Sequence, residues 1–189
     1  AYETTRFEVE PAAHLLERAV AHARQAAALD DGLAEAHGAL SLALGSAGRM
    51  PEAAAAAERA VNLEPLSWRH LFRLCRASWG VSRLTAGARS LSLYPEFALT
   101  YFQMALLHIA CGDLAEAEAL ARMGAAVQDQ QIARGERLPG RGLHWLLGTI
   151  RLAQGDAPDA RAAFQRELST MDLHHLHGRE FAVRSHFGL

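Results

Sequence analysis

The sequence has few of the features that mark secreted domains and membrane proteins. It has only two cysteines, Cys75 and Cys111, in separate predicted helices, so it offers no CxxC motif and no ladder of disulfide pairs. No apolar run reaches the ~20 residues that cross a bilayer, and no basic-then-apolar signal segment opens the chain. These absences favour two unpaired thiols, buried or half-buried, in a reducing compartment. The compartment is not fixed by the sequence, and the cytoplasm is the favoured one.

An excess of charge of one sign is also lacking. The 19 basic and 21 acidic side chains leave a formal net charge of -2, which gives no general case for binding nucleic acid or an anionic membrane. Aromatic residues make up only 7%, whereas half of the chain is apolar and much of that is alanine, which favours helices in close contact. The chain begins at Ala1 rather than at methionine, and we expect a processed or excised form that lacks an upstream region.

Motifs of catalysis are missing as well. The chain has no GxSxG nucleophile motif, and its glycine-rich stretch GERLPGRG lacks the preceding strand and the following GK[ST] of a phosphate loop. Cys75 and Cys111 each have a histidine within five residues, but no third group can be named that would orient it. We therefore predict that the chain is not an enzyme and binds no cofactor.

Ten histidines raise the question of a metal site. His174, His175 and His177 form the tightest set, and a spacing of three places two of them on one helix face, which two metal ligands could use. A surface cluster in a capping segment is the favoured interpretation, so we predict no metal. We expect the histidines within the repeats, such as His37 and His144, to be structural.

What the sequence does contain is an internal repeat. The stretches LHIACGDLAEAEAL and IRLAQGDAPDARAAF share an apolar segment, a Gly-Asp pair and alanines at helical spacing. The clearest unit covers residues 34–67: its first helix ends at Gly48, a suitable left-handed cap, and its second runs from about Pro51 to Pro65. Further units are predicted at 98–131 and 141–174, with a shortened unit at 68–97, a partial one at 11–33 and a polar insertion at 132–140.

The two ends of the chain are predicted to differ from the repeats. Residues 1–10 are expected to be extended or disordered. Residues 175–189 are expected to form a C-terminal capping segment in which Phe181 and Phe187 cover the open end of the array. In the Gly-Asp turns, we expect Gly112 to turn the chain and Asp113 to cap the helix that follows.

These recurring marks resemble the tetratricopeptide repeat, a helix-turn-helix unit of about 34 residues. The marks are His37, Leu40-Ser41, Leu44, Gly48, Ala53, Ala57, Ala60 and Pro65 in the first full unit; Tyr101, Met104-Ala105, His108, Gly112, Ala117, Ala121, Gly124 and Asp129 in the unit 98–131; and His144, Leu147-Gly148, Arg151, Gly155, Ala160, Phe164, Glu167 and Asp172 in the unit 141–174. Arg151 and Glu167 depart from the family pattern by replacing apolar marks. The resemblance covers roughly residues 12–174. It implies an all-α, right-handed α-solenoid of about four units, with an N-terminal helix and a C-terminal capping segment.

The resemblance also implies a concave groove, lined by the first helix of each unit, that holds a peptide or a partner helix. The repeat register places these residues inward: Glu35, Gly38 and Leu42; Arg69, Phe72, Arg73 and Arg76; Leu99, Phe102, Gln103 and Leu106; Trp145, Thr149 and Leu152. Some family members bind a partner's C-terminal carboxylate with a Lys/Asn/Arg clamp. That clamp is absent here, because its positions carry Gly38, Leu42, Phe102, Leu106, Trp145 and Thr149.

The projected groove combines an aromatic and aliphatic strip with one arginine cluster. Arginine pairs with carboxylate in a bidentate fork, and aromatic anchors dominate binding energy, so the groove suits a hydrophobic segment with an acidic flank. We predict a scaffold for a protein or peptide partner. Two alternatives stay open. Phe102 and Trp145 could be covered by the chain's own insertion or terminal segments, or by a second copy in a homodimer. The chain could also be a regulatory or oligomerisation segment of a larger protein whose catalytic or DNA-binding part lies upstream.

Overall fold

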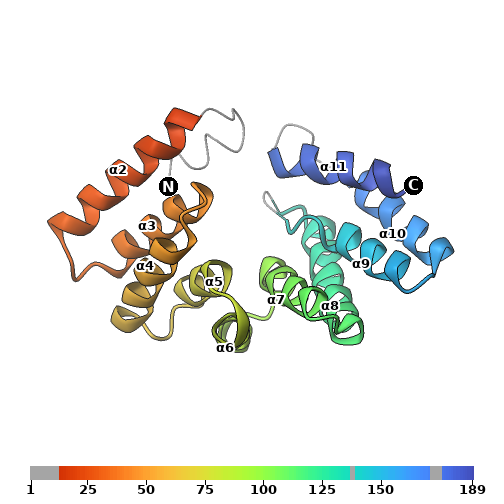
Figure 1. Ribbon diagram of the computed structural model, residues 1–189, viewed down its shortest axis with the longest axis horizontal. Coiled ribbons are helices and arrows are strands. Elements are labelled where there is room, and N and C mark those ends of the chain that lie inside the picture. The colour runs from red at the N-terminus through yellow and green to blue at the C-terminus, as the bar shows by residue number, and fades with distance from the viewer. Residues whose placement is uncertain (1–12, 137–138, 171–175) are drawn as a thin grey trace. The chain divides into compact units, whose positions relative to one another are not determined.

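The computed structural model describes residues 13–136, 139–170 and 176–189. Within these ranges the chain forms ten helices and no strand (Figure 1), which confirms the predicted all-α class. None of these helices is long and apolar enough to cross a membrane. The chain divides into two compact units, residues 1–94 and 95–189. The segment 1–10 that we expected to be extended or disordered lies outside the described residues.

The unit of residues 1–94 contains five of the described helices. They are α2 (Ala13–Leu29), α3 (Ala34–Ser46), α4 (Met50–Leu63), α5 (Trp68–Ala77) and α6 (Gly80–Leu93). Each helix from α2 to α5 packs on the one that follows it, and α3 also contacts α5. The helices α3 and α5 are the first members of the pairs α3–α4 and α5–α6, so the first helices of neighbouring repeats lie side by side.

The unit of residues 95–189 repeats this arrangement. It contains α7 (Ala98–Ala110), α8 (Leu114–Ala133), α9 (Leu143–Ala153), α10 (Ala157–Ser169) and α11 (Leu176–Gly188). Contacts run from each helix to the next, and the first helices α7 and α9 also touch each other. The final helix, α11, packs on both α10 and α9.

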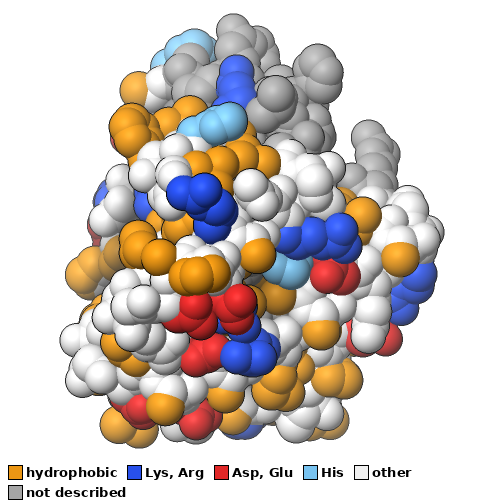
Figure 2. Space-filling model, turned by 90° about the vertical axis from the view of Figure 1, so that its right-hand side faces the viewer, with side chains coloured by type: hydrophobic (Ala, Val, Ile, Leu, Met, Phe, Trp, Pro, Cys, Tyr) orange, Lys and Arg blue, Asp and Glu red, His pale blue; other side chains and the backbone are white. Residues whose placement is uncertain are grey.

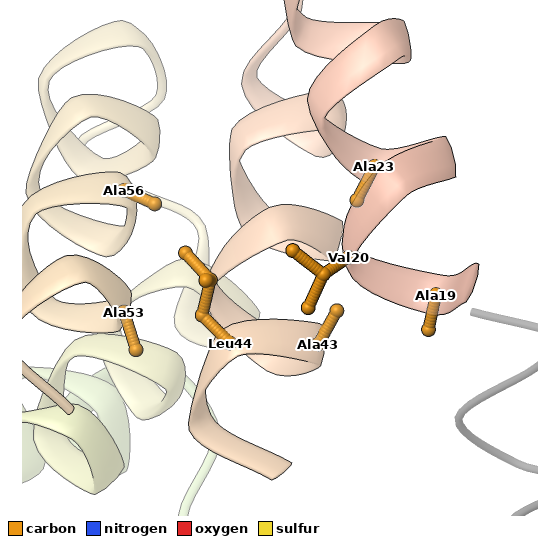
Figure 3. Packing of buried hydrophobic residues seen from close by; sticks show 7 residues of the cluster. All are labelled: Ala19, Val20, Ala23, Ala43, Leu44, Ala53 and Ala56. Atoms are coloured by element: carbon orange, nitrogen blue, oxygen red, sulfur yellow. The ribbon is translucent and has the colours of Figure 1, made fainter. Parts of the chain in front are cut away.

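Alanine makes the close contacts between helices possible. Ala53, Ala57 and Ala60 on the second helix α4 are completely buried, as the repeat pattern predicted. Figure 3 shows the side chains of α2, α3 and α4 that meet around Val20 and Leu44. A methyl group fills little space, so the backbones approach closely and few large side chains are needed to fill the core.

The Gly-Asp turns behave as the sequence predicted. Gly112 and Gly155 have φ angles of 79° and 85°, a region that residues with a β-carbon avoid. The side chain of Asp113 accepts a hydrogen bond from the backbone N–H of Glu116 at 3.3 Å, and so caps the start of α8. Asp156 does the same for α10. A left-handed glycine followed by an N-cap is therefore a local device that the chain uses twice.

The shortened repeat owes its length to the first helix of its pair. Helix α5 has 10 residues, whereas α3 and α7 have 13 each. The buried guanidinium of Arg83 on α6 donates hydrogen bonds to the carbonyls of Cys75 at 3.2 Å and Ser78 at 2.9 Å. The indole of Trp79 lies 4.7 Å from the Arg83 guanidinium carbon. Arg83 thus satisfies carbonyl groups that the missing turn of helix would otherwise have used.

Helix α8 is longer than the sequence indicated. It continues to Ala133, beyond the predicted unit 98–131, because no glycine or proline follows Asp129 before Gly135. The added turn positions Gln131, whose side chain donates to the carbonyl of Glu96 and accepts from the N–H of Gly140. The side chain of Gln131 therefore connects the start of the predicted insertion to its last residue, Gly140.

Candidate partner-binding surface

Three arginines on α5 lie at the positions that the repeat register placed in the groove. Arg69, Arg73 and Arg76 follow one another at helical spacing of four and three, and we call them the arginine face. Arg73 and Arg76 border a shallow hollow that is open to solvent. The rest of its lining is Ser41, Leu42, Gly45, Met50 and Ala77. The surface thus joins a largely apolar floor to a basic rim.

Arg73 already holds a carboxylate. Its guanidinium donates two hydrogen bonds to Glu35 on α3, at 2.8 and 3.0 Å. These bonds hold the pKa of Glu35 below its usual value, against the opposing effect of partial burial. Gly38 makes the approach possible, because a β-carbon there would lie against the Arg73 guanidinium and 2.8 Å from Nδ1 of His70. The glycine on α3 therefore leaves room for the Arg73 side chain to pass over the helix and reach Glu35.

His70 extends this network into the core. Arginine can only donate, so Nδ1 of His70 accepts from Arg73 at 3.0 Å, and the proton of the neutral ring lies on Nε2. Nε2 then donates to the carboxylate of Glu64 at 3.2 Å. The ring is 1% exposed, and burial, followed by the charge of Arg73, holds the pKa of His70 below 6.5. The neutral imidazole thus keeps Arg73 aligned with Glu35.

The other two arginines of the face have different partners. Arg69 is exposed, with its guanidinium carbon 4.7 Å from the centre of the Trp68 ring, which in turn packs against Tyr94. Arg76 is half-buried and donates to the hydroxyl of Ser46 at 3.4 Å. Phe72, the fourth projected groove residue of this repeat, is also half-buried. Positive charge therefore spans the length of α5 on one side.

In the unit of residues 95–189, the two predicted aromatic groove residues meet a third ring. The ring of Phe181, on α11, lies 5.8 Å from that of Phe102 and 5.5 Å from that of Trp145, measured between centroids. We call these three side chains the aromatic cluster; all three are half-buried. Of the alternatives left open by the sequence, the terminal segment is the one found on Phe102 and Trp145.

The remaining projected groove residues of this unit do not form one cluster. Leu99 and Leu152 are 36% and 49% exposed. The hydroxyl of Thr149 donates to the carbonyl of Trp145 one turn earlier at 3.0 Å. Gln103 and Leu106 are half-buried.

Glu167 positions the helix that carries Trp145, and the sequence did not reveal how. Its fully buried carboxylate accepts hydrogen bonds from the backbone N–H groups of Gly142, His144 and Trp145, at 2.7, 3.0 and 3.3 Å. The amide of Gln128 adds a fourth at 3.2 Å. Glu167 thus caps α9 from a different helix, α10. The only signal in the sequence was that an acidic residue replaces an apolar mark.

Three further features concern polar or terminal residues: Arg134, the two cysteines and Phe187. Arg134, in the predicted insertion, is exposed and pairs with Glu96 at 3.1 Å and Glu136 at 3.0 Å. Cys75 is buried, but Cys111 is exposed, because it follows the last residue of α7 at the turn. Phe187 does not cover the end of the array; it is 89% exposed.

The C-terminal histidines are only partly described. His174 and His175 lie outside the described residues, while His177 is exposed and lies 3.3 Å from Glu180. In the described ranges, no group of three or more histidine, cysteine or acidic side chains is arranged to hold a metal ion. Figure 2 shows the side on which α9, α10 and α11 lie; acidic and basic side chains are interspersed there with small hydrophobic areas.

Comparison with known proteins bears on the fold. No protein-family model matches the sequence, and no curated protein matches it. Among solved structures, TTC0263, a thermophilic TPR protein of Thermus thermophilus, gives a TM-score of 0.73 at 17% identity over 99% of this chain and 97% of that chain. MamA gives 0.64 at 16% identity over 83% and 89%. A tetratricopeptide repeat protein from Parabacteroides merdae ATCC 43184 gives 0.61 at 18% identity over 94% and 70%.

The chain has a tetratricopeptide-like fold. At these identities the likeness concerns the arrangement of helices, and it confirms the predicted α-solenoid of helix pairs. Arg151 and Glu167, the departures from the tetratricopeptide pattern, both have polar partners: Glu167 caps α9, and Arg151 pairs with Asp159 at 2.9 Å. Each replaces an apolar contact between helices with directed hydrogen bonds.

A polar latch recurs in this tetratricopeptide-like array. In each case a buried side chain in the first turn of a first helix binds the chain that precedes the helix. The pairs are His37 with the carbonyl of Asp31, His70 with the carboxylate of Glu64, Tyr101 with the carbonyl of Pro95, and His144 with the carboxylate of Asp129, at 3.0, 3.2, 3.0 and 3.0 Å. The structural role expected for His37 and His144 is therefore confirmed.

Proposed function

We propose that this chain is a non-catalytic scaffold that binds a protein partner, and that its arginine face receives an acidic stretch of that partner. The observation that carries the proposal is the hollow beside α5, where Arg73 and Arg76 border an apolar floor. A hydrophobic segment with an acidic flank fits such a surface, because its apolar side chains cover the floor while its carboxylates meet the rim.

The contact between Arg73 and Glu35 supports this choice of partner. It is a bidentate arginine–carboxylate pair on the same surface, formed within the chain. Arg69 supports it too, since an arginine held against an indole presents its N–H groups at a lower cost in side-chain entropy. In the second unit, Leu99, Leu106 and Leu152 are proposed to supply hydrophobic contacts beside the polar side chains of Gln103 and Thr149, whereas Phe102 and Trp145 are already covered by Phe181.

A random-peptide phage library, selected on the purified full chain, tests the proposal and does not require the partner to be identified. We expect the selected peptides to combine aspartate or glutamate with adjacent apolar residues. The double variant Arg69→Gln/Arg76→Gln should bind a selected peptide about 10-fold more weakly, as expected when two partly screened ion pairs of ~0.5–1 kcal/mol each are lost. The wild-type affinity should fall as salt is raised.

The matched control is Arg89→Gln/Arg122→Gln, which removes the same charge from exposed positions on the second helices α6 and α8. It should leave peptide affinity unchanged. Far-ultraviolet circular dichroism checks that both double variants retain their helices. Selected peptides without an acidic bias, or equal losses in the two double variants, would contradict the proposal.

A further inference from the structure

Helix α11 contacts aromatic side chains of the two first helices of its unit. Its Phe181 ring lies between Phe102 of α7 and Trp145 of α9, in edge-on and tilted geometries that aromatic pairs prefer. The ring also lies directly over Gly142, where an added β-carbon would be 2.5 Å from it. Phe181 therefore occupies the place on the first helices where the repeat register predicted that a partner would bind.

A second side chain of α11 contacts the same surface. The Arg184 guanidinium carbon lies 5.1 Å from the centre of the Trp145 ring, and Glu180 accepts a hydrogen bond from Arg184 at 2.6 Å. Cations over an indole ring are attracted by its π-electrons. Phe181 and Arg184 are three residues apart, so both point from one face of the helix. The helix thus makes a two-point contact, one aromatic and one cationic.

The rest of α11 has an exposed side and a buried side. Its exposed side includes Val183 and Phe187, which are 55% and 89% exposed. On its buried side, the hydroxyl of Ser185 is fully buried without a hydrogen-bond partner. Burying an unpaired hydroxyl opposes docking. Helix α11 therefore combines a specific aromatic and cationic contact with one buried hydroxyl that opposes its docking, and that hydroxyl favours exchange for a competing helix.

We propose that α11 acts as an internal ligand on the surface formed by the first helices α7 and α9. The same surface would bind a partner helix that carries an aromatic residue and, three residues later, an arginine. This proposal rests on the proposed function, because it assumes that the first helices bind a protein. It goes further by naming the partner's chemistry, which is the chemistry of the present occupant. A partner with that pair of side chains displaces α11 by mass action, since both compete for one surface.

Competition with a tethered helix has a measurable consequence. A tethered segment acts at an effective concentration of about 1 mM, so a free helix meets a strong competitor in the wild-type chain. In Phe181→Ser, that competitor is weakened while the surface itself is unchanged. The probe is a fluorescent synthetic peptide with the sequence of residues 176–189. We expect the full-length Phe181→Ser chain to bind it at least 10-fold more tightly than wild type does.

The controls separate recognition from general loosening. The peptide that carries Phe181→Ser should not bind either chain, and a chain with Val183→Ser, an exposed position of the same helix, should behave as wild type. In the wild-type chain, hydrogen exchange at the amides of α11 should become faster when excess wild-type peptide is added. This arm needs no substitution, so the proposal stays testable if Phe181→Ser fails to fold.

Equal peptide affinity for wild type and Phe181→Ser would overturn the proposal, as would unchanged exchange in α11. A wild-type chain that forms a dimer through exchange of α11, dissociated by the peptide, would identify a second copy as the occupant and overturn the choice of a foreign partner. Because these tests leave the arginine face untouched, their failure is distinct from a failure of the acidic-peptide experiment.

Discussion

Replacing Glu167 with alanine should destabilise the second unit more than its single carboxylate suggests. The change removes the acceptor for three backbone N–H groups at the start of α9 and for the Gln128 amide. The carboxylate is fully buried, so water does not reach it in the folded chain. A buried donor left without an acceptor costs ~1–3 kcal/mol.

The magnitude follows from how many donors stay buried. The N–H of Gly142, at 2.7 Å, and that of His144, at 3.0 Å, belong to buried residues, whereas Trp145 is half-buried. Counting the two buried backbone donors fully, and allowing water to bind the other two, gives a loss of about 2–6 kcal/mol. Glu167→Gln keeps the shape and one acceptor oxygen but turns an amide N–H₂ toward a donor, so about half of that loss is expected.

Urea denaturation followed by circular dichroism measures the loss, and hydrogen exchange shows where it acts. The matched control is Gln165→Ala, an exposed position on the same helix, which should change stability by less than ~0.5 kcal/mol. Exchange at the amides of Gly142 and His144 should accelerate strongly in Glu167→Ala. If Glu167→Ala and Gln165→Ala are equally stable, or if those amides exchange at the wild-type rate, the carboxylate does not hold α9 in the way described.

Three further predictions concern packing, protonation and thiol chemistry. Gly38→Ala should cost about 1–3 kcal/mol, because the new methyl group lies 2.8 Å from the buried ring of His70; Gly45→Ala, on the same helix with its nearest neighbour 3.8 Å away, should be neutral or stabilising by denaturation. Burial holds the pKa of His70 below 6.5. As the pH falls through 6.5, the unfolded chain therefore binds a proton more readily than the folded chain does, and the free energy of unfolding decreases. Denaturation at about pH 7.5 and about pH 5.5 should show a smaller decline in His70→Gln than in wild type. Iodoacetamide should label the exposed Cys111 in the native chain but not Cys75, whose pKa burial raises to about 12, as peptide mass spectrometry can verify.

Features encoded within a few residues were predictable from the sequence. The turn at Gly112 and the cap at Asp113 depend only on neighbouring residues, and the buried alanines follow from a period repeated along the chain. The role of Glu167 was not predictable, because its partners lie some 25 residues away. A carboxylate at a position that is usually apolar shows that the packing differs there, but it does not show which groups the carboxylate binds. Phe181 was assigned to the capping helix, yet its contact with Phe102 depends on the angle at which α11 crosses the unit, which no local pattern specifies.

The latch between His144 and Asp129 has a consequence for how the chain can change in length. Their sequence separation is 15, whereas the corresponding pairs in the other repeats are separated by 6. The latch and the bridge from Gln131 to Gly140 therefore hold both ends of the insertion in place, whatever number of residues lies between them. Doubling such a loop costs only about 0.6 kcal/mol in closure entropy. This point of the array is consequently open to insertion, whether by evolution or for attaching a fluorophore or an affinity tag, without a change in repeat register.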